Sequence, residues 1–411
     1  MRMFRLEIKR IIKTKQTMVL IGIGLLLSLL MAYLPISYES VNYIDNNGTK
    51  VSVNGLEAIK YKKSVREINE GIVTTDKVYS ALEKYQSVVR EYESDETKVP
   101  LDVYTKKILP IRPLISRVPE VYANPTTGIG TEFMDVQLNN FGDYYEQSTQ
   151  HLDDIMKIEY AKNTDAKNRA IKMYNKVDKP FQLYGGFSID AFDYITLYIL
   201  LLLIICTSIA APTFSEGYQN GSDSIFRCTK NGRFGMAATK IAALFSIVVI
   251  FFAVCISVQL LTLNFAFGTE SMKTSVQMLF SAISLVPYNL GELQIAIVVS
   301  GLLSLLATMS FSLFVSSKCR SPLTTLLVSM IICFTPTILY GTTGNSWISY
   351  LLPSSGIGLR NSMLYQLIDL NFLNVGQVSV WSPYIIIAGA LFELILFLIL
   401  AVRSYCKHEV I

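Results

Sequence analysis

The residues best suited to a molecular task lie in a polar segment, residues 213–234, between two long apolar runs. The side chains that attract attention are Phe214, Glu216, Asp223, Ile225, Phe226, Arg233 and, at the start of the next run, Lys240. A short helix from about Ser222 would place Asp223 at its positively polarised amino end and present Ile225 and Phe226 to a partner. We therefore expect this segment to bind another protein. The alternative is a plain connection between two spans with an ordinary helix cap.

Motifs for catalysis are missing from the sequence. It holds no phosphate-binding loop, no nucleophile elbow, no zinc-protease motif and no C-x-x-C pair. We therefore expect no enzyme activity, no bound cofactor and no metal in this chain. His151 stands near Asp153 and Asp154, which allows a metal site, but three such residues on an exposed helix are more often a solvated face.

One carboxylate lies inside an apolar run. Glu393 is near the middle of residues 383–402, where a carboxylate costs roughly 2.5–3.5 kcal/mol. A functional interpretation makes Glu393 an acid for coupling or substrate contact. The interpretation we favour is a protonated glutamic acid hydrogen-bonded to a neighbouring span.

The composition predicts a membrane protein, whose spanning helices would position the residues described above. Only 17% of the residues are charged and the mean hydropathy is +0.39, whereas soluble domains are about one quarter charged. Six runs reach the length of about 20 apolar residues that a spanning helix needs. They cover residues 17–36, 192–212, 241–265, 293–316, 323–340 and 383–402. A shorter run, 276–286, is expected to be interfacial or re-entrant.

Most of the charge lies between the first two spans. Residues 37–190 hold 20 of the 36 Lys and Arg and 23 of the 32 Asp and Glu, so the net charge of the chain carries no nucleic-acid signal. Apolar steps through Val78, Leu82, Tyr85 and Val89 predict a helix. Two more helices are expected, over residues 141–160 and after Asn163, with an extended or looped stretch over residues 100–125.

Orientation follows from the Lys and Arg residues that flank the spans, because these gather on the cytoplasmic side. The basic flanks are Arg2, Arg5, Lys9, Arg10, Lys13, Lys15, Arg227, Lys230, Arg233, Lys318, Arg320, Arg403 and Lys407. Both termini and residues 213–234 are therefore expected in the cytoplasm, and residues 37–190 outside. The fold class is an all-α polytopic membrane protein with six transmembrane helices and a mostly helical extracellular domain between the first and second.

Two further segments are expected to lie in the membrane interface. Residues 1–16 are expected to form an amphipathic helix, with Phe4, Ile8 and Ile11 on one face. The alternative is a basic flank that only sets the orientation of the first span. The outer loop 341–382 is long and apolar, and tryptophans bracket it, as at a membrane surface. We expect it to be a helical hairpin that dips into the membrane. The alternative is a loop packed under the extracellular domain.

The polar segment resembles the signature of type-2 ABC transporter permeases. The residues that match in order are Phe214, Glu216, Gly221, Ser222, Ile225, Phe226, Thr229, Gly232, Arg233 and Lys240. The resemblance covers the transmembrane part. The extracellular domain between the first two spans is similar to that of a subset from Gram-positive bacteria.

The resemblance implies a permease subunit in the bacterial cell membrane. It implies partners as well: a dimer of separate cytoplasmic ABC ATPase subunits, which would bind the ATP and Mg, a second permease subunit that is identical or different, and membrane lipid. Phe214 to Arg233 would dock on the ATPase. The substrate is expected to be a peptide or an amphipathic molecule, which the transporter exports or to which it confers resistance. The alternative function is a membrane sensor or receptor with an extracellular ligand-binding domain and no transport.

Overall fold

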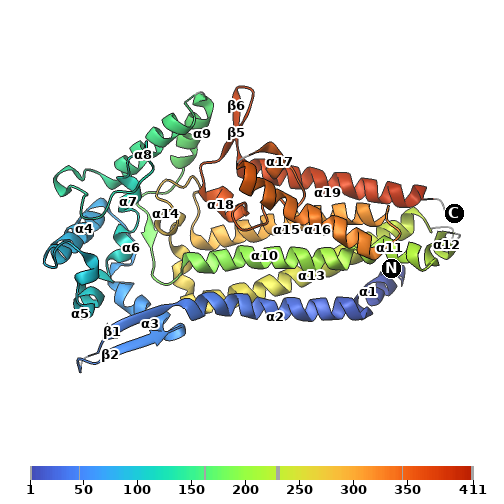
Figure 1. The fold of residues 1–411 in the computed structure, drawn as a ribbon, viewed down its shortest axis with the longest axis horizontal. Coiled ribbons are helices and arrows are strands. Elements are labelled where there is room, and N and C mark those ends of the chain that lie inside the picture. Colours follow the sequence, from blue (N-terminus) through green and yellow to red (C-terminus); the bar gives the residue numbers. More distant parts are fainter. Residues whose placement is uncertain (1, 46, 162, 228–231, 345, 409–411) are drawn as a thin grey trace.

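The chain forms an elongated bundle of helices, with the elements between α2 and α10 at one end and both termini at the other (Figure 1). The structure is a computed structural model, and it describes residues 2–45, 47–161, 163–227, 232–344 and 346–408. We call residues 39–188, between the first two long helices, the inserted region. The far end of the bundle is called the terminal end.

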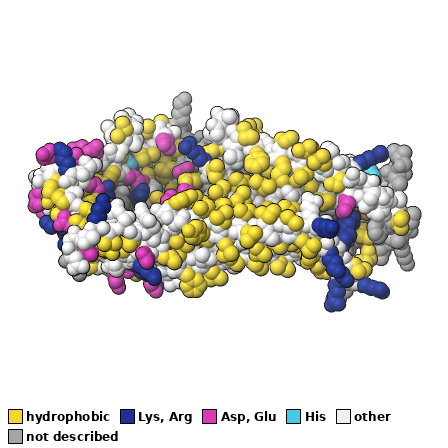
Figure 2. Space-filling model, turned by 60° about the horizontal axis from the view of Figure 1, so that its bottom comes forward, with side chains coloured by type: hydrophobic (Ala, Val, Ile, Leu, Met, Phe, Trp, Pro, Cys, Tyr) yellow, Lys and Arg dark blue, Asp and Glu magenta, His cyan; other side chains and the backbone are white. Residues whose placement is uncertain are grey.

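In the described residues, six helices are long and apolar enough to cross a membrane. This finding confirms the predicted six spans and indicates a multi-pass membrane protein. They are α2 (Lys15–Tyr38), α10 (Ile189–Ala210), α13 (Phe234–Phe267), α15 (Leu290–Ser316), α16 (Pro322–Thr343) and α19 (Ser382–Lys407). Figure 2 shows hydrophobic side chains over the middle of the molecule and charged side chains gathered at its two ends.

Helix α15 packs against α10, α16 and α19. Its small residues Gly301, Ser304, Ala307 and Ser310 are all buried. A Cβ atom on Gly301 would lie 3.0 Å from Cγ2 of Ile199 on α10. Small side chains therefore let these backbones approach closely.

The inserted region is mostly helical, as predicted. Its helices are α3 (Leu56–Arg66), α4 (Thr75–Arg90), α5 (Leu101–Val103), α6 (Arg112–Ile115), α7 (Val118–Val121), α8 (Tyr144–Glu159) and α9 (Thr164–Tyr174). Its strands are β1 (Ser40–Ile44), β2 (Lys50–Asn54), β3 (Gly71–Ile72) and β4 (Gln182–Leu183), which pair as antiparallel β1–β2 and β3–β4. The predicted seam of α4 is confirmed, since Val78, Leu82, Tyr85 and Val89 are buried.

The proline-rich stretch differs from its prediction. Residues 100–125 were expected to be extended or looped, but they form α5, α6, α7 and a π-helical turn at Tyr104–Ile108. Pro113 and Pro119 stand in the first turns of α6 and α7, where a proline sacrifices no helical hydrogen bond. Prolines therefore start short helices here.

The short apolar run 276–286 packs beneath the inserted region. It begins with α14 (Val276–Leu279), and most of its apolar side chains are buried. The Tyr174 hydroxyl donates to the Ala282 carbonyl at 2.9 Å, and Arg117 Nη1 donates to the Phe280 carbonyl at 2.6 Å. The apolar character of this run is thus explained by contact with protein.

The loop between α16 and α19 also reaches the inserted region. It contains α17 (Trp347–Tyr350), α18 (Met363–Ile368) and the antiparallel hairpin of β5 (Phe372–Val375) and β6 (Val378–Trp381), where a helical hairpin was expected. The Ser379 amide donates to Asp165 Oδ2 at 2.7 Å, and the Tyr160 hydroxyl donates to the Leu370 carbonyl at 2.9 Å. The β5–β6 hairpin therefore packs against the inserted region, as the alternative interpretation of this loop predicted. That other parts of the loop dip into the membrane stays a prediction.

Candidate functional site at the terminal end of the bundle

The polar segment begins as an extension of α10. Helix α11 (Pro212–Gln219) follows α10 directly, and α12 (Ser222–Arg227) follows α11 after a tight turn. Gly221 in that turn has φ of +71°, which favours glycine. Asn220 Oδ1 accepts hydrogen bonds from the Ser222 amide and hydroxyl, so the turn carries its own cap.

Helix α11 is clamped to the end of α15. The backbone amides of Phe214 and Ser215 both donate to Ser316 Oγ at 3.1 Å. The same hydroxyl donates to the Ala211 carbonyl at 2.7 Å. One buried serine thus satisfies three polar backbone groups near the start of α11, where amides have no intrahelical partners.

Tyr405, near the end of α19, contacts both short helices. The Phe214 side chain is fully buried, and its ring centroid lies 4.9 Å from that of Tyr405. The Tyr405 hydroxyl donates to Asp223 Oδ1 at 2.7 Å. Asp223 is only 5% exposed, so this charge-assisted bond anchors α12 to the last span.

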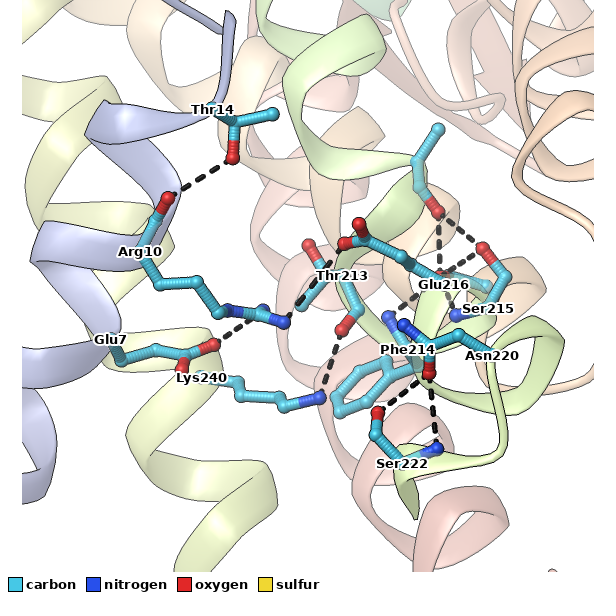
Figure 3. Close-up of polar contacts among 12 residues, drawn as sticks. Glu7, Arg10, Thr14, Thr213, Phe214, Ser215, Glu216, Asn220, Ser222 and Lys240 are labelled. Carbon is cyan, nitrogen blue, oxygen red and sulfur yellow. Dashed lines mark hydrogen bonds and ion pairs between the residues drawn. The ribbon is translucent and has the colours of Figure 1, made fainter. Parts of the chain in front are cut away.

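Lys240 connects the segment to α13. Its side chain is 4% exposed, and Nζ donates to the Thr213 carbonyl at 3.1 Å (Figure 3). The ammonium also lies 5.7 Å from the centroid of the Phe214 ring, within the range of a cation–π contact. Lys240 therefore ties the base of α13 to the start of α11.

The amino-terminal helix joins the same cluster. Helix α1 (Arg2–Lys13) packs against α13 and α2. Arg10 Nη2 lies 2.6 Å from Glu7 Oε1, and Arg10 Nη1 lies 3.9 Å from Glu216 Oε2 (Figure 3). Glu216 is half exposed, so this ion pair is weak, but it places α1 beside α11.

The predicted site residues fall into two groups. Phe214, Asp223 and Lys240 are buried and hold the segment against the spans. Glu216, Ile225 and Arg233 are exposed, and Ile225 is 72% exposed. The helix predicted from Ser222 is confirmed. The Phe226 side chain lies outside the described residues, as does Thr229 of the matched pattern.

Sequence reasoning missed Tyr405 and Ser316. Each lies about a hundred residues or more along the chain from its partner in the segment. In the sequence, Tyr405 lies between Arg403 and Lys407, just after the last apolar run. Its position at the end of that predicted span was the only sequence signal that it could contact the polar segment. Tyr218 was missed too, and its ring centroid lies 4.2 Å from that of His408.

The two other candidates are simpler. Glu393 is 7% exposed on α19, and its carboxyl has no hydrogen-bond partner among the described residues, so the favoured bond to a neighbouring span is not seen. His151 is buried on α8, and burial lowers its pKa. Asp153 instead pairs with Lys157 and Lys167, and the described residues contain no cluster fit to hold a metal.

Helix α12 therefore lies at the end of the bundle with an exposed apolar side chain, Ile225. It is bonded to α19 through Asp223, and the adjoining α11 is bonded to α13 and α15. This arrangement suits a contact that passes force into several spans at once. Comparison with protein-family models, with curated proteins and with solved structures finds no match to this chain.

Proposed function

We propose that this chain is the transmembrane permease subunit of an ABC transporter. A separate cytoplasmic ATPase would bind α12 and drive the export of a peptide or amphipathic substrate. The proposal rests on the ordered resemblance from Phe214 to Lys240. The observation that carries it is the exposed Ile225 on the short helix α12, which together with α11 is bonded to the ends of α13, α15 and α19.

A permease without its own ATP-binding motifs needs a mechanical connection to its motor. Exposed apolar side chains that enter a partner's groove supply most of the energy of such contacts. Movement of α12 would pass through Asp223 to Tyr405 on α19 and, through Phe214, to Ser316 on α15. Lys240 would carry the same movement into α13.

The first prediction concerns Ile225. The full chain is expressed in its native host at its native level and purified in mild detergent, and the co-purifying ATPase is quantified. Ile225→Asp is expected to lower the retained ATPase at least tenfold, which corresponds to about 1.4 kcal/mol, because the substitution places a charge in an apolar contact.

A matched control makes this test specific. Ile129→Asp introduces the same charge at an isoleucine that is 71% exposed in the inserted region. That variant is expected to retain the ATPase as well as the unaltered chain does. Equal retention by Ile225→Asp would remove the docking role of α12. If no ATPase accompanies even the unaltered chain, the sensor or receptor function replaces the permease.

A further inference from the structure

A small pocket at the junction of the inserted region and the spans is lined by three arginines. Arg66 at the end of α3, Arg112 at the start of α6 and Arg117 before α7 meet there, around a volume of about 220 Å³. None of the residues that line the pocket is Asp or Glu. Three cations around one cavity predict an anionic ligand.

The nearby carboxylates compensate these cations only in part. Arg112 Nη1 lies 3.4 Å from Glu96 Oε2, a carboxylate that also accepts the Tyr85 hydroxyl. Arg117 Nη1 lies 3.9 Å from Glu120 Oε2, which accepts the Ala282 amide at 3.0 Å. Both acids are therefore shared with other donors.

Arg66 has less compensation than the other two. Burial lowers its pKa, while the charge of Glu39 acts in the opposite direction. Glu39 itself is paired with Lys62 Nζ at 2.7 Å. In the described residues, Arg66 Nε and Arg117 Nε are buried without a hydrogen-bond partner, whereas Arg112 Nη1 has the ion pair with Glu96. Desolvated cations with open donor positions favour a bound anion.

The rest of the pocket is apolar. Ile189 at the start of α10, Leu290 at the start of α15 and Leu279 on α14 contribute to the lining. Two of these residues mark the ends of spans, which is the level at which lipid headgroups lie. The side chains of Arg112 and Arg117 remain 33% and 23% exposed, so a ligand can reach them.

We propose that this pocket binds a phosphate-type anion and that the source of the anion is the headgroup of a membrane lipid. The volume is below the roughly 300 Å³ of a site for a whole small molecule, so it accommodates the headgroup while the acyl chains lie along the spans. Arginine is suited to this task because its planar fork binds two phosphate oxygens at once. The inference is independent of the permease function.

The second prediction tests this site with lipid bound to the purified full-length chain, counted by native mass spectrometry. Phosphatidylglycerol is expected to bind at least tenfold more tightly than phosphatidylcholine. Arg66→Gln and Arg112→Gln are each expected to weaken phosphatidylglycerol binding about tenfold, since each removes a charge-assisted hydrogen bond. Lys106→Gln removes an exposed cation of the inserted region outside the pocket lining and is expected to change nothing.

A second variant keeps the test decisive if an arginine variant fails to fold. Leu279→Trp fills the pocket, retains all three arginines and is expected to weaken phosphatidylglycerol binding to a similar extent. Unchanged binding in both Arg66→Gln and Leu279→Trp would overturn the proposal, as would equal affinity for phosphatidylcholine. Inorganic phosphate that binds as tightly as phosphatidylglycerol would overturn the lipid as the source of the anion.

Discussion

Tyr405 shows how one side chain holds the candidate site together. Its ring packs on Phe214 and its hydroxyl bonds Asp223, so it joins α11 and α12 to the last span. The buried residues Phe214 and Asp223 of the polar segment and Lys240 of α13 therefore hold α11 and α12 in place beneath the exposed Ile225. Loss of an anchor should loosen α11 and α12 and leave the spans in place.

The third prediction is that Tyr405→Phe loosens the polar segment locally. Removing a hydrogen bond to a buried carboxylate costs about 1–3 kcal/mol. Amide hydrogen exchange of residues 212–227 is expected to become about tenfold faster. Tyr384→Phe, at the exposed opposite end of α19, is the control and should leave this exchange unchanged. The anchoring role is refuted if both variants exchange alike.

At the scale of elements, the connection between α18 and β5 meets the end of α8 at a contact that responds to pH. Burial, reinforced by the charge of Glu159, raises the pKa of Asp369 to about 6. Burial also raises the pKa of Glu159. Because the folded protein holds the Asp369 proton more tightly than the unfolded chain, Asp369 stabilises the fold at low pH. This contribution is lost as pH rises through about 6.

The fourth prediction uses Asp369→Asn to isolate this effect. The buried His151 acts in the opposite direction, because its lowered pKa removes stability as pH falls below about 6.5. Both proteins contain His151, so its effect cancels when their stabilities are compared. Between pH 7 and 5, thermal unfolding should show that the unaltered chain gains stability relative to Asp369→Asn as pH falls. Asp76→Asn alters an exposed acid and should follow the unaltered chain. A constant difference across this range would contradict the assignment.

The elements also show what the sequence could predict. The six spans were found because a membrane-crossing helix needs a long apolar run, whatever its neighbours are. The run 276–286 was predicted to be interfacial or re-entrant because hydropathy cannot distinguish burial under protein from burial in lipid. The exposure of Ile225 agrees with the predicted docking helix. The burial of Phe214, Asp223 and Lys240 depends on partners that are remote in sequence, such as Ser316 and Tyr405, so periodicity gave no sign of it.

At the scale of the whole molecule, two polar ends are separated by an apolar middle (Figure 2). The inserted region occupies one end, and α1, α12 and the end of α19 occupy the other (Figure 1). The basic flanking residues predict that the terminal end is cytoplasmic. A ligand at the arginine pocket and a motor at α12 would thus act on opposite sides of the membrane.

The fifth prediction tests this orientation with Ser87→Cys. Ser87 is exposed on α4, and the native cysteines all lie outside residues 37–190. In intact cells, an impermeant thiol reagent is expected to label Ser87→Cys strongly. Ser148→Cys, at a fully buried position of the same region, is the control and should stay unlabelled. Labelling of Ser87→Cys only after lysis would reverse the predicted topology.

The hydrogen bond between Asp165 and Ser379 has a consequence for biosynthesis. These residues are 214 positions apart, and a ribosome adds about 5–20 residues per second. The surface of α9 that receives the β5–β6 hairpin is therefore complete roughly 10–40 s before the hairpin is made. During that interval the nascent inserted region lacks its contact with the β5–β6 hairpin, and a chain that stops before β6 never forms that contact.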